Sequence, residues 1–127
     1  MADDKKLLMI TEQGGYPNFT ALYQGCGYQV IAERNMRKAM KVVRKMQPTA
    51  IVAEFNYQSD FRDRTSSLES LLATVQKLQQ NDVIRIKVLV FFERQYTPQL
   101  EKLQNMFNNF EALPFPIEEN RLMSILK

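Results

Sequence analysis

Hydrophobic residues in this sequence fall into short continuous runs, separated by longer segments in which apolar positions recur at helical spacing. The runs are rich in leucine, isoleucine, valine and alanine, and they lie at 7–10, 28–32, 49–53, 84–92 and 111–117. The fourth run finishes as Val88–Phe92 without a polar residue, which is typical of a strand buried on both faces. The pattern predicts five strands, the last of them weakened by Pro114 and Pro116.

Between the predicted strands, apolar residues recur every three or four positions, as they do along one face of a helix. The clearest helix is expected from residue 66, where Thr65 or Ser66 can act as N-cap and Glu69 completes a capping box. A second helix is expected after the N-cap residue Asn35. Three more are expected over 17–24, 97–107 and 118–127. The helix positions expected to face inward are Met36, Ala39, Met40, Val43, Met46, Leu68, Leu71, Leu72, Val75, Leu78, Leu100, Leu103, Met106, Phe107, Leu122, Ile125 and Leu126.

Five strands that alternate with five helices favour a parallel sheet between two layers of helices, because parallel strands need long crossover connections. We expect residues 1–127 to form one such α/β domain. Ligands of these sheets bind beyond the carboxyl ends of the strands. The residues that follow the predicted strands are therefore candidates for a site: Thr11, Glu12, Gln13, Glu54, Phe55, Asn56, Phe92, Glu93, Leu113 and Pro114.

Composition narrows the possible functions. Hydrophobic residues make up 45% of the 127 positions and charged residues 24%, which fits one globular domain and excludes a disordered chain. The sequence has no histidine and a single cysteine, Cys26, so an internal disulfide, a His/Cys zinc site and histidine-based catalysis are excluded. We therefore predict a protein that is not an enzyme. No apolar run is long enough for a signal peptide or a membrane span, which predicts a cytoplasmic protein with no membrane contact.

Two stretches of the sequence resemble the receiver domain of bacterial two-component response regulators. Residues 27–33 lead into a helix as they do in receivers, and Leu113-Pro-Phe115 looks like the receiver Lys-Pro-Phe signature. The order of predicted elements agrees over nearly the whole chain. The resemblance implies a flavodoxin-like (βα)5 fold like that of CheY, with sheet order 2-1-3-4-5, and a signalling role through contacts with a protein partner.

The chemical positions of a working receiver are changed in this sequence. A receiver needs an acidic pair after its first strand, an aspartate after the third, a hydroxyl residue after the fourth and a lysine after the fifth. Here the corresponding residues are Thr11 with Glu12, then Glu54, Phe92 and Leu113. Phosphoryl transfer depends on positioning and on cations that neutralise developing charge, and Leu113 carries no charge. The resemblance therefore predicts a pseudo-receiver with a degenerate phosphorylation site.

The two glutamates of this site have more than one interpretation. Glu12 and Glu54 could form a relic divalent-cation site over the strand ends. Alternatively, both are solvated surface carboxylates, or Glu54 pairs with Arg62 or Arg64 of the following polar segment. We favour these alternatives, because two neighbouring carboxylates repel each other and no third acid is present. We predict no bound metal.

The segment Thr11–Thr20 supports an alternative function. Its hydroxyl residues and the pair Gly14-Gly15 faintly resemble the phosphate loop of flavodoxins, in which backbone amides bind a phosphate. The spacing differs from that of flavodoxins, and a plain turn is the favoured interpretation. We predict no cofactor, and keep a small flavin-type phosphate ligand as the alternative.

Positive charge is concentrated in the helix expected after Asn35. Residues 33–45 contain six basic residues and one acid, a net +5 in a chain whose total is +3. The basic positions recur at helical spacing opposite the methionines and predict a solvent-facing basic stripe, made of Arg37, Lys38, Lys41, Arg44 and Lys45. A solvated helix face is the favoured interpretation, and an acidic partner or nucleic acid is the alternative. Nucleic acid is disfavoured because no aromatic residue accompanies the stripe to stack on bases.

The resemblance also implies where a partner would bind. Receivers commonly pair through their fourth helix, fifth strand and fifth helix, which here correspond to 97–109, 111–117 and 118–127. Aromatic residues are enriched at the energetic centres of interfaces, and Tyr96, Phe110 and Phe115 are the candidate anchors on this face. A homodimer through this face is one form that such an interaction could take. Phe115 is equally well interpreted as part of the hydrophobic core.

Overall fold

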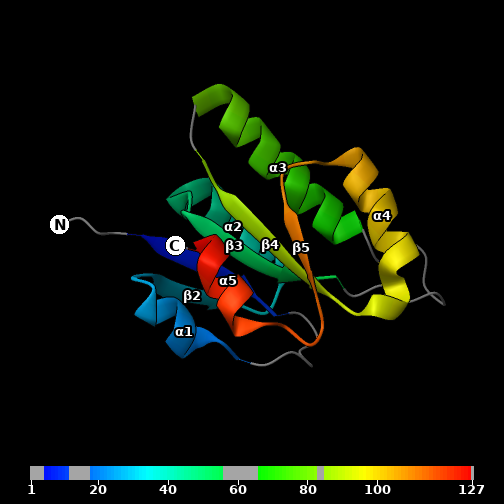
Figure 1. The fold of residues 1–127 in the computed structure, drawn as a ribbon. Helices are drawn as coiled ribbons and strands as arrows, with labels where there is room; N and C mark the ends of the chain where they lie inside the picture. Colours follow the sequence, from blue (N-terminus) through cyan, green and yellow to red (C-terminus); the bar gives the residue numbers. More distant parts are fainter. Residues whose placement is uncertain (1–4, 12–17, 56–65, 83–84, 127) are drawn as a thin grey trace.

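A computed structural model describes residues 5–11, 18–55, 66–82 and 85–126 of the chain. Strands and helices alternate as the sequence predicts, with a short 3-10 helix inserted after the fourth strand (Figure 1). In chain order the elements are β1 Lys6–Ile10, α1 Thr20–Gly25, β2 Gln29–Glu33, α2 Met36–Met46, β3 Ala50–Glu54, α3 Ser66–Asp82, β4 Lys87–Phe92, η1 Arg94–Tyr96, α4 Thr97–Met106, β5 Glu111–Pro114 and α5 Glu119–Leu126.

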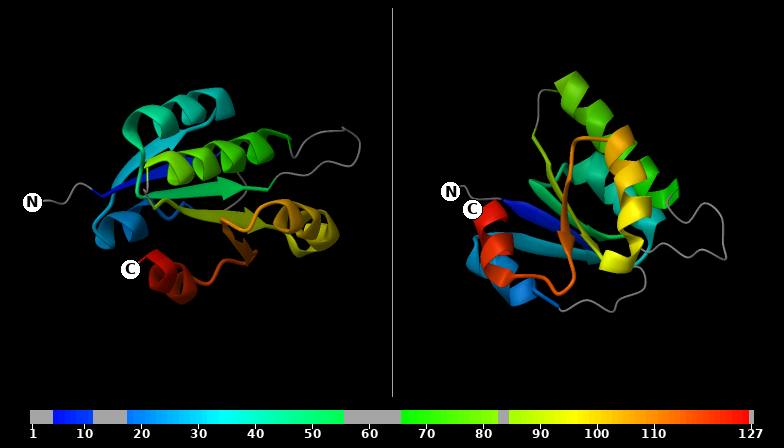
Figure 2. Two further views of the ribbon diagram at one scale, coloured as in Figure 1. Left: turned by 90° about the horizontal axis from the view of Figure 1, so that it is seen from above. Right: turned by 45° about the vertical axis from the view of Figure 1, so that its right-hand side comes forward.

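The five strands form one parallel sheet in the order β2-β1-β3-β4-β5, which confirms the predicted fold class. Helices α1 and α5 cover one face of the sheet, and α2 and α3 cover the other (Figures 1 and 2). In the register of the central strands, Met9 of β1 lies beside Val52 of β3, and Glu54 of β3 lies beside Phe91 of β4. Because the strands are parallel, they all end at the same edge of the sheet, where the described residues of the predicted site lie.

Two clusters of buried side chains occupy the two faces of the sheet. The first joins the sheet to α2, α3 and α4, and the second joins it to α1 and α5. Leu71 and Leu72 of α3 are fully buried in the first cluster, and Leu122 and Leu126 of α5 are buried in the second. Within the described residues, no helix is both long enough and apolar enough to cross a bilayer.

Individual residues account for both ends of α2 and for the turn that follows α1. The Asn35 side chain accepts a hydrogen bond from the Lys38 backbone N–H at 3.1 Å, which confirms the predicted N-cap of α2. Gln47 ends that helix in the left-handed conformation, with φ of 47°. Gly27 has φ of 95° in the turn between α1 and β2, a conformation that glycine adopts without a steric penalty.

Several predicted boundaries and inward positions are wrong. Met46 and Met106 are 42% and 54% exposed, although both continue the apolar spacing of their helices. Each is the last residue of its helix and lies past the final buried positions, Val43 and Leu103. The last strand stops at Pro114 rather than Ile117, and the fourth begins at Lys87 rather than Ile84. The predicted Thr65 cap and the start of α1 at Pro17 lie outside the described residues.

The two edges of the sheet differ in their free hydrogen-bonding groups. On β5, the Phe115 N–H donates to the Phe92 carbonyl at 2.8 Å. The backbone groups of Leu113 and Phe115 therefore point toward β4, and those of Pro114 point outward. Proline has no N–H, so this edge lacks a donor at that position. On β2, the Gln29 N–H donates to the Lys5 carbonyl, and the Glu33 carbonyl accepts from the Thr11 N–H. The backbone N–H and C=O groups of Val30 and Ala32 therefore point outward. Both of those residues keep their N–H groups.

Candidate functional site

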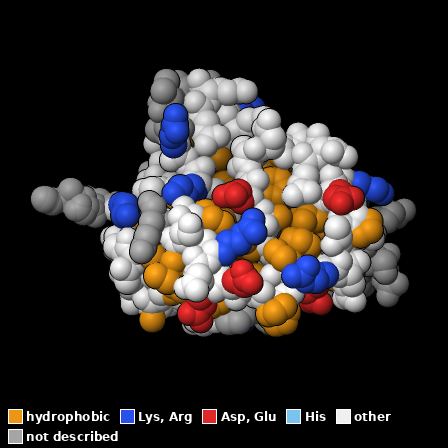
Figure 3. Space-filling view, in the orientation of Figure 1, with side chains coloured by type: hydrophobic (Ala, Val, Ile, Leu, Met, Phe, Trp, Pro, Cys, Tyr) orange, Lys and Arg blue, Asp and Glu red, His pale blue; other side chains and the backbone are white. Residues whose placement is uncertain are grey.

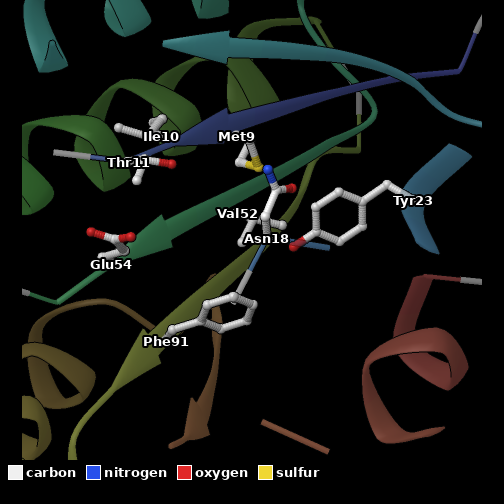
Figure 4. A pocket seen from close by; sticks show the side chains of 8 residues that line it. All are labelled: Met9, Ile10, Thr11, Asn18, Tyr23, Val52, Glu54 and Phe91. Carbon is white, nitrogen blue, oxygen red and sulfur yellow. The ribbon is translucent and has the colours of Figure 1, made fainter. Parts of the chain in front are cut away.

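The candidate site is a small pocket at the carboxyl ends of β1 and β3. Its volume is about 80 Å³, and its described lining comes from three strands and from the segment that leads through α1 (Figure 4). The lining residues are Met9, Ile10, Thr11, Asn18, Tyr23, Val52, Glu54 and Phe91. Thr11 and Glu54 lie on one side of the close-up view, and Asn18 and Tyr23 lie on the other. Two of the predicted site residues, Thr11 and Glu54, are thus brought together.

Glu54 is the last residue of β3, and its side chain is only 8% exposed. Its description as a solvated surface carboxylate is therefore wrong. The partner proposed for it in the relic cation site, Glu12, lies outside the described residues, and so do Arg62 and Arg64. Burial of a glutamate is unusual, because an ionised carboxylate is stabilised by water.

Aromatic rings form one wall of the pocket. Phe19 packs edge-on against Phe91 with ring centroids 6.1 Å apart, and against Tyr23 at 6.4 Å. Both contacts have the T-shaped geometry that aromatic pairs prefer. Burial raises the pKa of the Tyr23 hydroxyl well above its ordinary value, because the phenolate would lose its hydration. Tyr23 is therefore a neutral lining residue, and it is not positioned as a proton acceptor at neutral pH.

Phe92 and Leu113 occupy other parts of the fold. Successive residues of a strand point to opposite faces, so Phe92 packs in the first cluster while Phe91 reaches the pocket. Leu113 is 2% exposed in the second cluster, among residues of α1 and α5. Neither side chain lines the pocket that holds Glu54. The position that the resemblance assigns to a receiver lysine is thus a core position in this chain.

The described lining provides little for binding an anion or a cofactor. It contains one carboxylate, a hydroxyl, a phenol and an amide, and none of these described residues is a lysine or arginine. Sites that enclose a ligand of drug size usually measure about 300 Å³ or more, several times the volume of this pocket. Gly14 and Gly15 of the proposed phosphate loop lie outside the described residues. The described part of the site gives the flavin-type alternative no support.

Sequence reasoning missed several lining residues, including Met9, Asn18, Tyr23 and Phe91. Strand alternation could have found Phe91, because it lies two residues after Leu89 and shares its face of the sheet. Tyr23 follows Phe19 by four residues, the spacing of one helix face. Asn18 carried no such signal. Its carboxamide oxygen accepts a hydrogen bond from the Thr20 N–H at 2.9 Å, where α1 begins.

The candidate interface residues differ in exposure. Tyr96 and Phe110 are half-buried and pack against the first cluster, whereas Phe115 is 40% exposed after the end of β5. The interpretation of Phe115 as a core residue is therefore wrong. The basic stripe is solvent-facing as predicted, since its members are all exposed on α2: Arg37, Lys38, Lys41, Arg44 and Lys45.

Comparison with known proteins gives matches at the level of structure alone. No family model matches the sequence, and no curated protein matches it. The chemotaxis protein CheY4 of Vibrio cholerae superposes with a TM-score of 0.66 at 17% identity, over 97% of this chain and 96% of that one. A sensor protein from Polaromonas sp. JS666 gives 0.67 at 17%, over 96% and 92%. The response regulator receiver protein of Sinorhizobium medicae gives 0.65 at 14%, over 98% and 92%.

These similarities define the class of fold. The chain is a three-layer α/β domain of flavodoxin-like topology. Within that class it has the fold of response regulator receiver domains, as CheY does. At these identities the likeness extends to the fold, and the function is argued from the residues themselves.

Proposed function

We propose that this chain is a receiver-like signalling module that acts through protein contacts and does not depend on phosphoryl transfer. It is proposed to act without catalysing a reaction. The observation that carries the proposal is the burial of Glu54 in a pocket whose described lining contains no basic side chain. Phosphoryl transfer to a carboxylate needs an accessible oxygen and nearby cations, and the described lining supplies a buried carboxylate and no cation.

The residues around the pocket support the same proposal. Leu113 packs among Leu122 and Leu126, so the position that resembles the receiver lysine serves the core. Phe92 packs on the opposite face of the sheet from Glu54 and has no hydroxyl to hold a phosphoryl group. The positions Thr11, Glu12, Glu54, Phe92 and Leu113 are therefore proposed to be a degenerate phosphorylation site, of which Thr11 and Glu54 line the pocket.

A protein partner is proposed to bind across α4, β5 and α5. Figure 3 has the orientation of Figure 1 and shows hydrophobic side chains gathered over this face, with acidic and basic side chains around them. Phe115 and Met106 are exposed there. A cavity of about 290 Å³ lies beside β5, lined by Arg94, Leu113, Pro114, Pro116, Glu118 and Arg121. Apolar side chains ringed by charged ones are typical of protein interfaces.

Incubation with acetyl phosphate and Mg²⁺ is expected to leave the protein unmodified. The pocket lacks both an exposed carboxylate and a described basic side chain that could stabilise the transferring group. Intact-mass spectrometry measures the result directly. Glu54→Asp is the sharper variant, because it restores the shorter side chain of a receiver acceptor, and it too should stay unmodified. A CheY-type receiver in a parallel reaction shows that the donor is active.

A stable gain of one phosphoryl group on the parent protein would contradict this expectation if Glu54→Gln abolished it. Labelling that persists in Glu54→Gln would come from another residue, and would equally remove the proposal that the chain works without phosphorylation.

Self-association through the α4-β5-α5 face should weaken when Phe115 is replaced by glutamate. The new carboxylate would be desolvated in an apolar contact, and losing one aromatic anchor typically costs about 2 kcal/mol of binding free energy. That loss raises the dimer dissociation constant by about thirtyfold. Sedimentation equilibrium over a range of concentrations measures it. Met46→Glu is the matched control, since Met46 is similarly exposed but lies on α2. Equal dissociation constants for both variants would exclude this face as the dimer interface.

A further inference from the structure

β2 is an open edge of the sheet. It pairs only with β1, and the described residues contribute no strand on its other side. Val30 and Ala32 direct their N–H and C=O groups outward, because the alternate residues Gln29 and Glu33 make the hydrogen bonds to β1. The Ala32 side chain is exposed and small. Such an edge is a template for pairing with another extended chain.

The two edge strands, β5 and β2, differ in how well they are protected against pairing with another strand. Proteins protect exposed edges with proline or with charged side chains on the edge strand. Pro114 removes one of the two outward N–H donors of β5 and leaves that of Ala112, whereas the outward positions of β2 are Val30 and Ala32, which both keep their N–H. Glu33 is the one charged residue of β2, and it lies at the carboxyl end of the strand. The middle of β2 therefore keeps its capacity to add a strand.

Positive charge lies next to this open edge. α2 packs over β1 and β2, and its solvent side carries the basic stripe. The last turn of α2 contains Arg44 and Lys45. Because this crossover helix runs opposite to the strands, its last turn lies at their amino ends. Lys5 lies at that end too, with its ammonium group 4.6 Å from the centre of the Tyr28 ring. The amino half of the β2 edge is thus flanked by positive charge, with Lys5 on the α1 side of the sheet and the last turn of α2 on the other side.

Charge argues against a second copy of this chain as the occupant. Two copies paired antiparallel through β2 would be related by a two-fold axis normal to the sheet. That symmetry puts both α2 helices on the same face, so the two basic stripes would repel each other. An extended segment with negative charge meets no such repulsion. Its backbone can pair with β2 while alternate side chains face α2.

We propose that the β2 edge binds an extended acidic segment of a partner protein by strand addition. The Val30 and Ala32 backbone groups supply the hydrogen bonds. The basic residues of α2 select acidic side chains at the alternate positions that face this helix. This surface is separate from the α4-β5-α5 face, so the proposal does not depend on that interface.

The test uses the full chain and a fluorescein-labelled nine-residue peptide of alternating glutamate and valine. We expect anisotropy to report binding at low salt that weakens by about tenfold or more at about 0.5 M NaCl, since salt screens exposed charges. In ¹⁵N-HSQC spectra the Val30 and Ala32 amide signals should shift most. The matching lysine and valine peptide should not bind.

Two pairs of variants separate strand pairing from simple charge attraction. Ala32→Pro removes an outward N–H without touching the β1 ladder, and should weaken binding by about tenfold, while Ala32→Ser keeps the N–H and should bind as the parent does. Lys41→Glu combined with Lys45→Glu should also weaken binding, whereas Lys102→Glu on α4 should not. Circular dichroism checks that each variant is folded.

The contrary outcomes are equally specific. Absence of peptide binding at low salt would overturn the proposal. Equal binding by folded Ala32→Pro and Ala32→Ser would show attraction to α2 without strand pairing, and would overturn it too. Tighter binding of a single-stranded oligonucleotide than of the peptide, with no shift at Val30, would assign the basic stripe to nucleic acid instead.

Discussion

Replacing Leu113 with lysine should destabilise the protein by about 3 to 5 kcal/mol, because it places an ammonium group among the buried apolar side chains of the second cluster. Leu113 is 2% exposed and packs with Leu122 and Leu126 in the second cluster. A domain of this size has a total stability of roughly 5 to 15 kcal/mol, so the loss is a large part of it. Urea denaturation followed by circular dichroism measures the change in the free energy of unfolding.

The control is Leu113→Met, which conserves volume and should cost less than about 1.5 kcal/mol. Although Leu113→Lys introduces the residue type that a working receiver has, it should not permit labelling by acetyl phosphate, because Glu54 stays enclosed. A fully stable Leu113→Lys would mean that the side chain reaches solvent or a carboxylate. Labelling of that variant would mean that the pocket retains the rest of the receiver chemistry.

The free energy of unfolding should fall steeply above about pH 10, and Tyr23→Phe should remove part of that fall. Burial raises the pKa of Tyr23 in the folded state. Below about pH 10 the phenol is neutral in both states, so its ionisation has no effect. Above that pH the unfolded chain releases the proton and the folded chain holds it. The folded state then loses about 1.4 kcal/mol of stability per pH unit until the folded pKa is reached.

Urea midpoints of parent and variant between about pH 8 and pH 11.5 test this difference. Tyr28 contributes to the same slope, because burial and, secondarily, the nearby Cys26 raise its pKa. Tyr28→Phe is therefore a useful companion. It also removes the hydrogen bond from the Tyr28 hydroxyl to the Leu126 carbonyl, 2.8 Å long, and so lowers stability below about pH 10, where the phenol is neutral in both states. Parallel curves for the parent and Tyr23→Phe would mean that Tyr23 ionises normally in the folded protein.

The fold was predictable from the sequence because apolar strand segments and segments with helical spacing alternate along the whole chain. The unbroken apolar residues of β3 and β4 identify central strands, and the regular spacing on α2 and α3 identifies crossover helices. Helix ends were less predictable. Met46 and Met106 keep the periodicity of their helices, but a final turn can extend beyond the sheet, and spacing along the chain does not reveal where the sheet stops.

The site was predictable only in part, for a reason of geometry. Ends of parallel strands converge at one edge, which correctly brought Thr11 and Glu54 together. The side of the sheet that each residue faces depends on the exact pairing, and a shift of one residue exchanges the faces. This is why Phe91 lines the pocket where Phe92 was expected. Tyr23, on the other side of the same pocket, comes from a short helix with weak sequence signals.

Pro114, on the outer edge of β5, limits how far strand pairing can continue from one molecule to the next. A sheet with two receptive edges can polymerise, since each added unit presents a fresh edge for another. Here one side is receptive and the other is short of a donor. Strand addition is therefore favoured at β2 over β5, where Pro114 leaves Ala112 as the one outward N–H of the strand, and growth into a fibre is disfavoured.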